Sequence, residues 1–353
     1  MRQLDPLGVP SATGGAVSQA VRALAEADFS LIGGRFAAAG FALELPAPGI
    51  LQIKSPGAPD RASVLVSVGV HGDETGPIEL LARLLEGFSL EPAQLAVDLL
   101  VVVGNPGAIR AGKRFIDADL NRLFGVPRGA LDGALESGRA DAMIRASAAF
   151  FQHAGPARWH LDLHTAIRPS LYPTFAIVPE LIAPAVKASL IGWLGQAGIG
   201  AIVMNPKSAG TYSYYCAEHF GAAAGTLELG RVGSLGQNDL SLLADVEQAL
   251  GALLRGALLR GAPPGAARVA PHLFEVAQEV IKLSDDFRMG FGRDTQNFTA
   301  LAQGALIATD GATVYTVKHT EELVLFPNPD VRVGLRAGLM VVRCEAPPAS
   351  TTV

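Results

Sequence analysis

Short apolar runs alternate with amphipathic stretches along most of this chain. Val64–Val70 is a Val-rich run of apolar and small residues, as expected of a strand that is buried on both faces. In the segment after it, apolar residues recur at three- and four-residue spacing over Ile78–Leu85, which predicts a helix. Pro77 suits the first turn of that helix, because an N–H group there would have no partner within the helix.

The same alternation continues to about residue 260. Further strands are expected at Val97–Gly104, Trp159–Thr165, Thr174–Val178, Ala201–Met204 and Gly225–Leu229. Helices are expected at Ala16–Asp28, Glu136–Gln152, Leu181–Gln196 and Asp239–Leu259. Strands that alternate with helices predict an α/β fold, in which helices cover both faces of a parallel or mixed sheet.

A change in composition at Gly261–Gly265, which is rich in Pro and Gly, predicts a linker. After it come short β segments separated by turns, at Phe274–Ile281, Ala305–Ala308, Thr313–Thr316, Glu322–Phe326 and Leu339–Val342. We therefore expect an α/β domain over residues 1–261, of which 1–48 form a poorly defined lead-in. A small all-β domain is expected over residues 262–353.

Composition narrows the possible functions. The 353 residues are 49% hydrophobic, which is enough for a large core, and the net charge of −5 argues against a nucleic-acid partner. The apolar runs are too short or too interrupted to cross a bilayer, and the first residues lack the apolar core of a secretory signal. Cys216 and Cys344 lie far apart, as expected of buried, reduced thiols in a cytoplasmic protein. The sequence leaves the oligomeric state open.

Histidine and glutamate follow the first central strand directly. His71 and Glu74 stand three residues apart at its carboxyl end, where open α/β sheets bind ligands, and both residue types bind divalent metals. Alternatively, His71 caps the following helix and Glu74 lies in its first turn.

A second histidine lies on another predicted strand. Asp162 and His164 are two residues apart, so both side chains point to the same face near the strand's carboxyl end. Together, His71, Glu74 and His164 supply two imidazoles and one carboxylate, which is the ligand set of a catalytic zinc site.

Basic residues are concentrated between these motifs, at Arg110, Lys113, Arg114 and Arg122. One interpretation is a solvated loop with ion pairs to Asp117 and Asp119. The other is a loop that recognises an anion, since arginine binds carboxylates through two parallel hydrogen bonds.

Glu228 lies within an otherwise apolar strand that ends at Gly230. A buried carboxylate is costly, so Glu228 either pairs with a cation or has a raised pKa. A carboxylate beside a metal-activated water is well placed to act as a general base.

Several longer motifs occur in order from about residue 64 to 342: HGDET, GNPGAIRAGKRFIDADLNRLFG, WHLDLHTAIR, TLELG, GQNDL, VLFPNP and GLRAGLM. This ordered set resembles the zinc-dependent succinylglutamate desuccinylase/aspartoacylase family of carboxypeptidase-like metallohydrolases. The resemblance implies a zinc-carboxypeptidase-like mixed sheet flanked by helices, with a smaller C-terminal all-β domain.

The resemblance also implies a role for each residue at the metal. One Zn²⁺ per subunit is expected, held by His71, Glu74 and His164. Glu228 is expected to be the general base that activates the zinc-bound water, and Asp119 to orient His71 from behind.

Three further residues match the family's substrate contacts. Arg114 corresponds to the arginine beside the scissile carbonyl, whereas Asn121 and Arg122 correspond to the clamp on the amino acid's carboxylate. Residues that hold the acyl carboxylate are not defined by a motif; Arg168, Tyr212 and Tyr214 are candidates because they lie near the motifs.

The implied reaction is hydrolysis of the amide of N-succinyl-L-glutamate, a small tricarboxylate, to succinate and L-glutamate in arginine catabolism. Two alternatives stay open. The chain could be a related, aspartoacylase-like deacylase of another N-acyl amino acid, or a non-catalytic binder of anionic amino-acid derivatives.

Overall fold

The computed structural model describes residues 17–56, 61–125, 127–152, 154–257 and 270–344. The first part of the expected lead-in and the expected linker Gly261–Gly265 lie outside these residues. The predicted domain boundary between residues 261 and 262 therefore stays a prediction.

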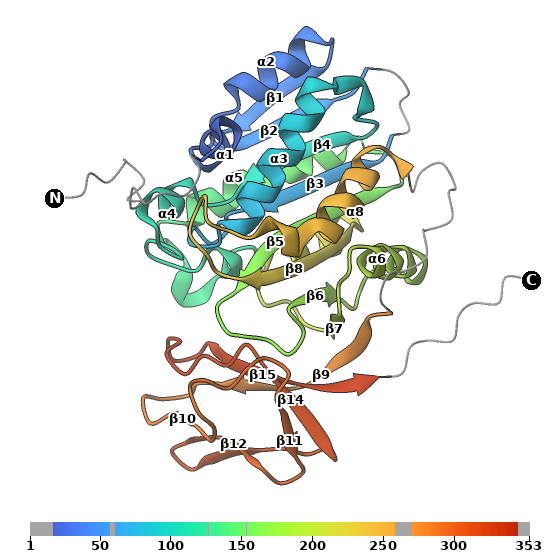
Figure 1. Cartoon of the computed structure of the whole chain (residues 1–353). Coiled ribbons are helices and arrows are strands. Elements are labelled where there is room, and N and C mark those ends of the chain that lie inside the picture. Colours follow the sequence, from blue (N-terminus) through green and yellow to red (C-terminus); the bar gives the residue numbers. More distant parts are fainter. Residues whose placement is uncertain (1–16, 57–60, 126, 153, 258–269, 345–353) are drawn as a thin grey trace, which may run out of the picture.

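Among the described residues, twelve strands form one mixed sheet in the order β1-β2-β4-β3-β5-β8-β6-β7-β9-β15-β14-β11 (Figure 1). Their bounds are β1 Ala42–Ala47, β2 Ile50–Lys54, β3 Ser63–Val68, β4 Asp98–Val103, β5 Arg158–Ala166, β6 Thr174–Pro179, β7 Ala201–Asn205, β8 Ala223–Arg231, β9 His272–Ile281, β11 Ala300–Ala302, β14 Glu321–Leu325 and β15 Arg336–Cys344. The four central strands β4, β3, β5 and β8 run parallel, so their carboxyl ends meet at one edge.

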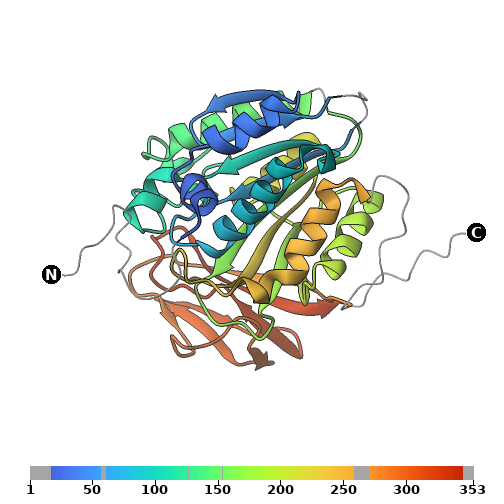
Figure 2. The same ribbon diagram turned by 45° about the horizontal axis from the view of Figure 1, so that its top comes forward.

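Helices cover both faces of this sheet. On one face α3 (Gly76–Leu90) packs against α1 (Gln19–Ala25), α2 (Ser30–Ala38) and α8 (Ala244–Leu254), and α6 (Pro184–Gln196) lies beside α8 (Figure 2). On the other face α5 (Ser137–Gln152) crosses strands β1 to β4, and α7 (Tyr212–Phe220) packs against β5, β6 and β8. The short helix α4 (Pro106–Ala111) follows β4.

The hydrophobic pattern explains the central layer. Every residue of β3 is buried, as expected of a parallel strand covered on both faces. Helix α3 begins at Gly76 with Pro77 in its first turn, and it buries Leu80, Leu81 and Leu85 completely against the sheet. The prediction of a mixed α/β sheet is thus confirmed.

Two segments differ from the sequence-based expectation. Within the supposed lead-in, α1 lies inside the helix expected at Ala16–Asp28, but helix α2 was not expected. Helix α2 contains two adjacent glycines, which are poor helix formers, but Ile32 and Phe36 bury it in the core. The long helix expected at Asp239–Leu259 starts as a 3-10 turn, Leu240–Leu243, and continues as α8 to Leu254.

The C-terminal segment forms the expected small β domain. It adds a three-stranded sheet, β10 (Arg288–Met289), β12 (Leu306–Asp310) and β13 (Thr313–Thr316), and it has its own apolar core around Phe287 and Met340. Strand β9 pairs in parallel with β7, so the large sheet continues into this domain, which lies below the α/β part in Figure 1. Cys216 and Cys344 are free thiols, as predicted; Cys216 is buried, but Cys344, at the end of β15, is only partly buried, contrary to the expectation.

Candidate active site

The predicted metal ligands and the predicted general base lie close together at the carboxyl ends of three neighbouring parallel strands. His71 and Glu74 follow β3, His164 lies near the end of β5, and Glu228 lies near the end of β8. His164 and Glu228 are direct cross-strand partners. The crevice at the carboxyl ends of such strands is the usual binding place of α/β sheets.

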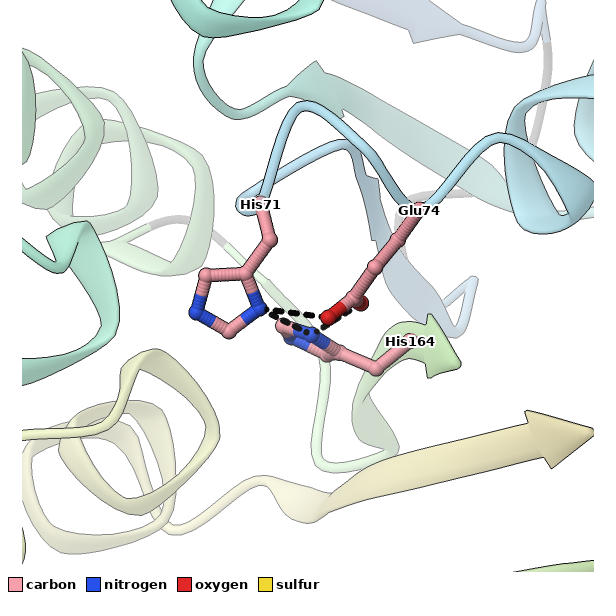
Figure 3. Close-up of side chains that lie close together, drawn as sticks. All are labelled: His71, Glu74 and His164. Atoms are coloured by element: carbon pink, nitrogen blue, oxygen red, sulfur yellow. Dashed lines mark hydrogen bonds and ion pairs between the residues drawn. The ribbon is translucent and has the colours of Figure 1, made fainter. Parts of the chain in front are cut away.

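Nitrogen and oxygen donors of His71, Glu74 and His164 converge in this crevice (Figure 3). His71 Nδ1 lies 2.8 Å from Glu74 Oε1, and His164 Nδ1 lies 2.8 Å from Glu74 Oε2 and 3.1 Å from His71 Nδ1. Bonds of about 2.0–2.1 Å in a tetrahedral zinc site place ligand atoms roughly 3.3 Å apart, close to these separations. This buried donor set therefore fits a single metal ion.

The Nε2 atom of each imidazole, on the side of the ring away from the other donors, contacts a carboxylate. Asp119 Oδ1 lies 2.9 Å from His71 Nε2, and Asp162 Oδ2 lies 3.0 Å from His164 Nε2. These contacts direct both Nδ1 atoms toward the centre, as in most metal sites with histidine ligands. Asp162 had no firm role in the sequence analysis, although its shared face with His164 already pointed to this contact.

Electrostatics keep these carboxylates ionised. Burial opposes a charge on Asp162, but the charge and hydrogen bond of His164, together with His160 and Ser67, outweigh it and lower the pKa of Asp162. Burial likewise opposes the charge of Asp119, yet Arg122 and His71 hold the pKa of Asp119 well below its ordinary value. Ser67 strengthens the arrangement by donating a 2.6 Å hydrogen bond to Asp162.

Arg114 and the backbone complete the surroundings of Glu74. Arg114 Nη1 lies 2.7 Å from Glu74 Oε1, and the backbone N–H of Thr165 donates to Glu74 Oε2 at 3.0 Å. The Arg114 side chain is 28% exposed, so it is not fully enclosed by the protein.

Unlike Glu74, Asp119 and Asp162, Glu228 has a carboxylate oxygen, Oε2, with no hydrogen-bond partner within the described structure. The residue is only 7% exposed. Burial and the negative charge of Glu74 raise the pKa of Glu228 to about 7, against the opposing charges of His164 and Arg114. A buried carboxylate with such a pKa is poised to accept and release a proton near neutral pH.

The basic loop between Lys113 and Arg122 is organised by a residue that the sequence analysis missed. Glu136 is 3% exposed and accepts backbone hydrogen bonds from Ile116 at 2.7 Å and Ala118 at 3.0 Å. No local pattern distinguishes a structural glutamate at the start of a helix, and only the tertiary structure reveals its partners.

Gly72 brings this loop against the metal donors. Its N–H donates to the Arg114 carbonyl at 3.0 Å. A Cβ atom at Gly72 would lie 2.3 Å from backbone atoms of Ala108 and Ile109, so only glycine allows this approach.

The structure places the remaining predicted residues as follows. Asn121 is 4% exposed, accepts a hydrogen bond from the Tyr212 N–H at 2.8 Å, and lies 3.4 Å from His164 Nε2. Arg122 remains partly exposed and approaches Asp119 Oδ2 only to 3.9 Å. Lys113 is exposed.

Three candidates for the acyl carboxylate make contacts within the protein. Arg168 donates to the backbone carbonyls of Pro327 and Arg293 in the β domain. The Tyr212 hydroxyl is buried against Ser147, and the Tyr214 hydroxyl donates to the Pro206 carbonyl.

Residues of the GQNDL motif and their neighbours form hydrogen bonds that connect the segment after β8 to the start of helix α3. Glu79 Oε1 accepts from Gly236 N–H at 2.6 Å and from Asn238 Nδ2 at 2.5 Å, while Thr75 Oγ1 donates to the Gly233 carbonyl at 2.8 Å. The strand that carries Glu228 is thereby tied to the helix that follows Glu74.

This fold and this site define an α/β enzyme with a candidate metal centre. Residues 60–254 match the family model for the succinylglutamate desuccinylase/aspartoacylase catalytic domain, and residues 269–344 match that for the AstE/AspA barrel-sandwich hybrid domain. The chain belongs to the succinylglutamate desuccinylase/aspartoacylase family, whose named relatives here are hydrolases.

Relatives from Burkholderia are similar over most of their length. The succinylglutamate desuccinylase of Burkholderia orbicola strain MC0-3 is 47% identical over 284 residues, which cover 80% of this chain and 81% of that protein. The succinylglutamate desuccinylase of Burkholderia pseudomallei strain 1710b is 44% identical over 298 residues, which cover 83% and 84%.

Solved structures agree in fold. A succinylglutamate desuccinylase from Vibrio cholerae has a TM-score of 0.78 at 33% identity and covers 86% of this chain and 88% of its own. One from Chromobacterium violaceum has a TM-score of 0.73 at 33% identity, covering 90% and 98%. None of the helices in the part of this chain that the structure describes has the length and apolar character that a bilayer crossing requires.

Proposed function

We propose that this protein is a zinc-dependent amidohydrolase that cleaves N-succinyl-L-glutamate to succinate and L-glutamate. The observation that carries the proposal is the unpaired Glu228 carboxylate beside the buried donors of His71, Glu74 and His164. Identity of 47% to a Burkholderia succinylglutamate desuccinylase supports the choice of substrate.

His71, Glu74 and His164 are the proposed ligands of one Zn²⁺. Two imidazoles and a carboxylate leave a fourth position open, as in catalytic zinc sites. Zinc at this point supplies a Lewis acid beside the scissile carbonyl and makes water more acidic.

Glu228 is the proposed general base. It takes a proton from the attacking water and later delivers that proton to the amine nitrogen of the leaving glutamate. Its pKa of about 7 suits both steps, because the carboxylate and its protonated form are then similar in free energy at neutral pH.

Arg114, Asn121 and Arg122 are the proposed substrate contacts. Arg114 stabilises negative charge that develops on the carbonyl oxygen, from its position against Glu74. The partly exposed Arg122, next to Asn121, binds the carboxylate of the amino-acid moiety. Asp119 is a positioning residue that holds His71.

The test measures succinate release from N-succinyl-L-glutamate by the purified protein before chelation, after chelation and after zinc is restored. Release that the chelator abolishes and zinc restores is expected. The Glu228→Gln variant, which keeps all three donors, is expected to bind zinc but to turn over substrate far more slowly.

Other outcomes contradict specific parts of the proposal. Rapid release of acetate from N-acetyl amino acids, with little release of succinate, would identify a related deacylase. Zinc binding without turnover of any acyl amino acid would identify a binder of anionic amino-acid derivatives.

A further inference from the structure

Arg336 is a buried cation without a matching hydrogen bond. It is the first residue of β15 and part of the GLRAGLM motif, and its side chain is 16% exposed. Its buried Nη1 atom has no hydrogen-bond partner among the described residues. The nearest carboxylate oxygen, Glu279 Oε1, lies 3.7 Å away, beyond hydrogen-bond distance.

The segment before Arg336 contacts the basic loop of the candidate active site. Arg332 Nη2 donates to the Asp117 carbonyl at 3.2 Å, which joins the β14–β15 connection to the loop that carries Asp119 and Arg122. The β domain therefore lies against this loop four residues before Arg336, and Arg336 is close enough to Arg122 and Asp119 to feel the charge of both.

Few carboxylates lie close to the Arg336 guanidinium to balance its positive charge. Burial, and then the positive charge of Arg122, lower the pKa of Arg336 to about 10, while Glu279 and Asp119 act in the opposite direction. Asp119 is already engaged by His71, and Glu279 also pairs with Lys207 at 3.7 Å. Two neighbouring guanidinium groups with so few close carboxylates suit an anionic ligand.

We propose that Arg336 of the β domain binds the side-chain carboxylate of the substrate's amino-acid moiety, next to the α-carboxylate that Arg122 holds. This inference rests on the proposed function, and it assigns part of the substrate specificity to the C-terminal domain. The side-chain carboxylate is favoured over the acyl carboxylate because Arg336 lies with Arg122, whereas Arg114 beside Glu74 marks the reacting bond.

The test compares three substrates with the wild type and Arg336→Gln. N-succinyl-L-glutamate carries both distal carboxylates, N-succinyl-L-glutamine lacks that of the side chain, and N-butyryl-L-glutamate lacks that of the acyl group. A hydrogen-bonded charge contributes about 1.5–3 kcal/mol, so Arg336→Gln is expected to lower kcat/KM by roughly 10- to 100-fold on both glutamate substrates. On N-succinyl-L-glutamine the loss is expected to be much smaller.

Arg343→Gln is the matched control. It removes the same charge from the same strand, about 23 Å further along at 3.3 Å per residue, where Arg343 contacts His272 and Tyr172. Its rates are expected to match those of the wild type on all three substrates.

Two results would overturn the assignment. An equal loss on all three substrates would make Arg336 structural, and a loss confined to the two succinyl substrates would place it at the acyl carboxylate. Calorimetric binding of L-glutamate and L-glutamine to both proteins makes the same comparison without turnover. Failure of the proposed reaction is thereby distinguished from failure of this inference.

Discussion

Each imidazole of the candidate metal centre directs one nitrogen to the donors and the other to a carboxylate. For His164 that carboxylate is Asp162, which Ser67 in turn holds on the neighbouring strand. Ser67 and Asp162 are direct cross-strand partners in the β3–β5 register, so the sheet itself fixes the orientation of the imidazole.

Asp162→Asn is therefore expected to weaken zinc binding by about 10- to 100-fold, the usual cost of losing such a partner. Competition with a chromogenic chelator measures this affinity. Asp98→Asn is the control, since Asp98 lies at the opposite, amino-terminal end of β4 and accepts a hydrogen bond from Ser55. Unchanged zinc affinity in Asp162→Asn would show that the imidazole is oriented by other contacts.

The protonation state of Glu228 is expected to determine how kcat/KM depends on pH. Only its ionised form accepts a proton, so kcat/KM is expected to fall as the pH decreases through its pKa, with a slope of one. A bound cation favours the charged form, which puts the midpoint at or below the value of about 7.

The pH profile of kcat/KM across neutral pH, for the wild type and Glu228→Gln, checks this assignment. The variant is expected to lose about 10²- to 10⁴-fold in rate, and the acidic limb that belongs to Glu228 with it. A rate that rises toward acidic pH in the wild type would exclude Glu228 as the base.

At the scale of elements, the sequence predicted those helices and strands in which buried apolar residues are continuous or recur at regular spacing. The central strands and α3 agree with their predicted ranges because each is buried on a continuous face. Helix α7 was missed because its sequence, YSYYCAEHF, is rich in aromatic residues and lacks an apolar stripe. The contacts of Glu136 with the basic loop could not be predicted either, since they join residues about twenty positions apart through tertiary packing.

Glu136 offers a test of how rigid the basic loop must be. Glu136→Gln replaces a carboxylate that accepts several backbone N–H groups with an amide, whose NH₂ group cannot accept them. The free energy of unfolding is expected to fall by about 1–3 kcal/mol, and KM is expected to rise because Arg122 loses its fixed position.

Chemical denaturation and steady-state kinetics measure these two effects of Glu136→Gln. Glu86→Gln, at a partly exposed position in the C-terminal half of α3, is the control for loss of a carboxylate charge. A variant that is less stable but has normal KM would show that the loop tolerates movement.

At the scale of the whole molecule, the α/β part and the small β domain share one continuous sheet. The pairing of β7 with β9 links them, and it could not be predicted, because register between distant strands is set by packing that a local pattern does not contain. Because the sheet is continuous, Arg336 of the β domain lies near a candidate site whose other residues all precede residue 230 in the sequence.

Zinc is expected to stabilise the whole fold in a pH-dependent way. Burial opposes protonation of His164, but Asp162 and Glu74 raise its pKa well above the ordinary value, and Glu74 and Asp119 also raise the pKa of His71. Protonated imidazoles thus stabilise the metal-free protein at low pH, and this contribution is lost as the pH rises through the raised pKa values. Zinc requires the deprotonated imidazoles, so its effect grows over the same range.

The increase in Tm caused by zinc is therefore expected to be larger at alkaline than at acidic pH. At a free concentration of about 100 times Kd the stabilisation amounts to about 2.7 kcal/mol. Thermal denaturation of chelated and zinc-loaded protein over a pH series measures it, with Mg²⁺, which prefers oxygen ligands, as the control metal. A zinc effect that increases toward acidic pH would contradict imidazole ligation, because protons would then no longer compete with the metal for His71 and His164.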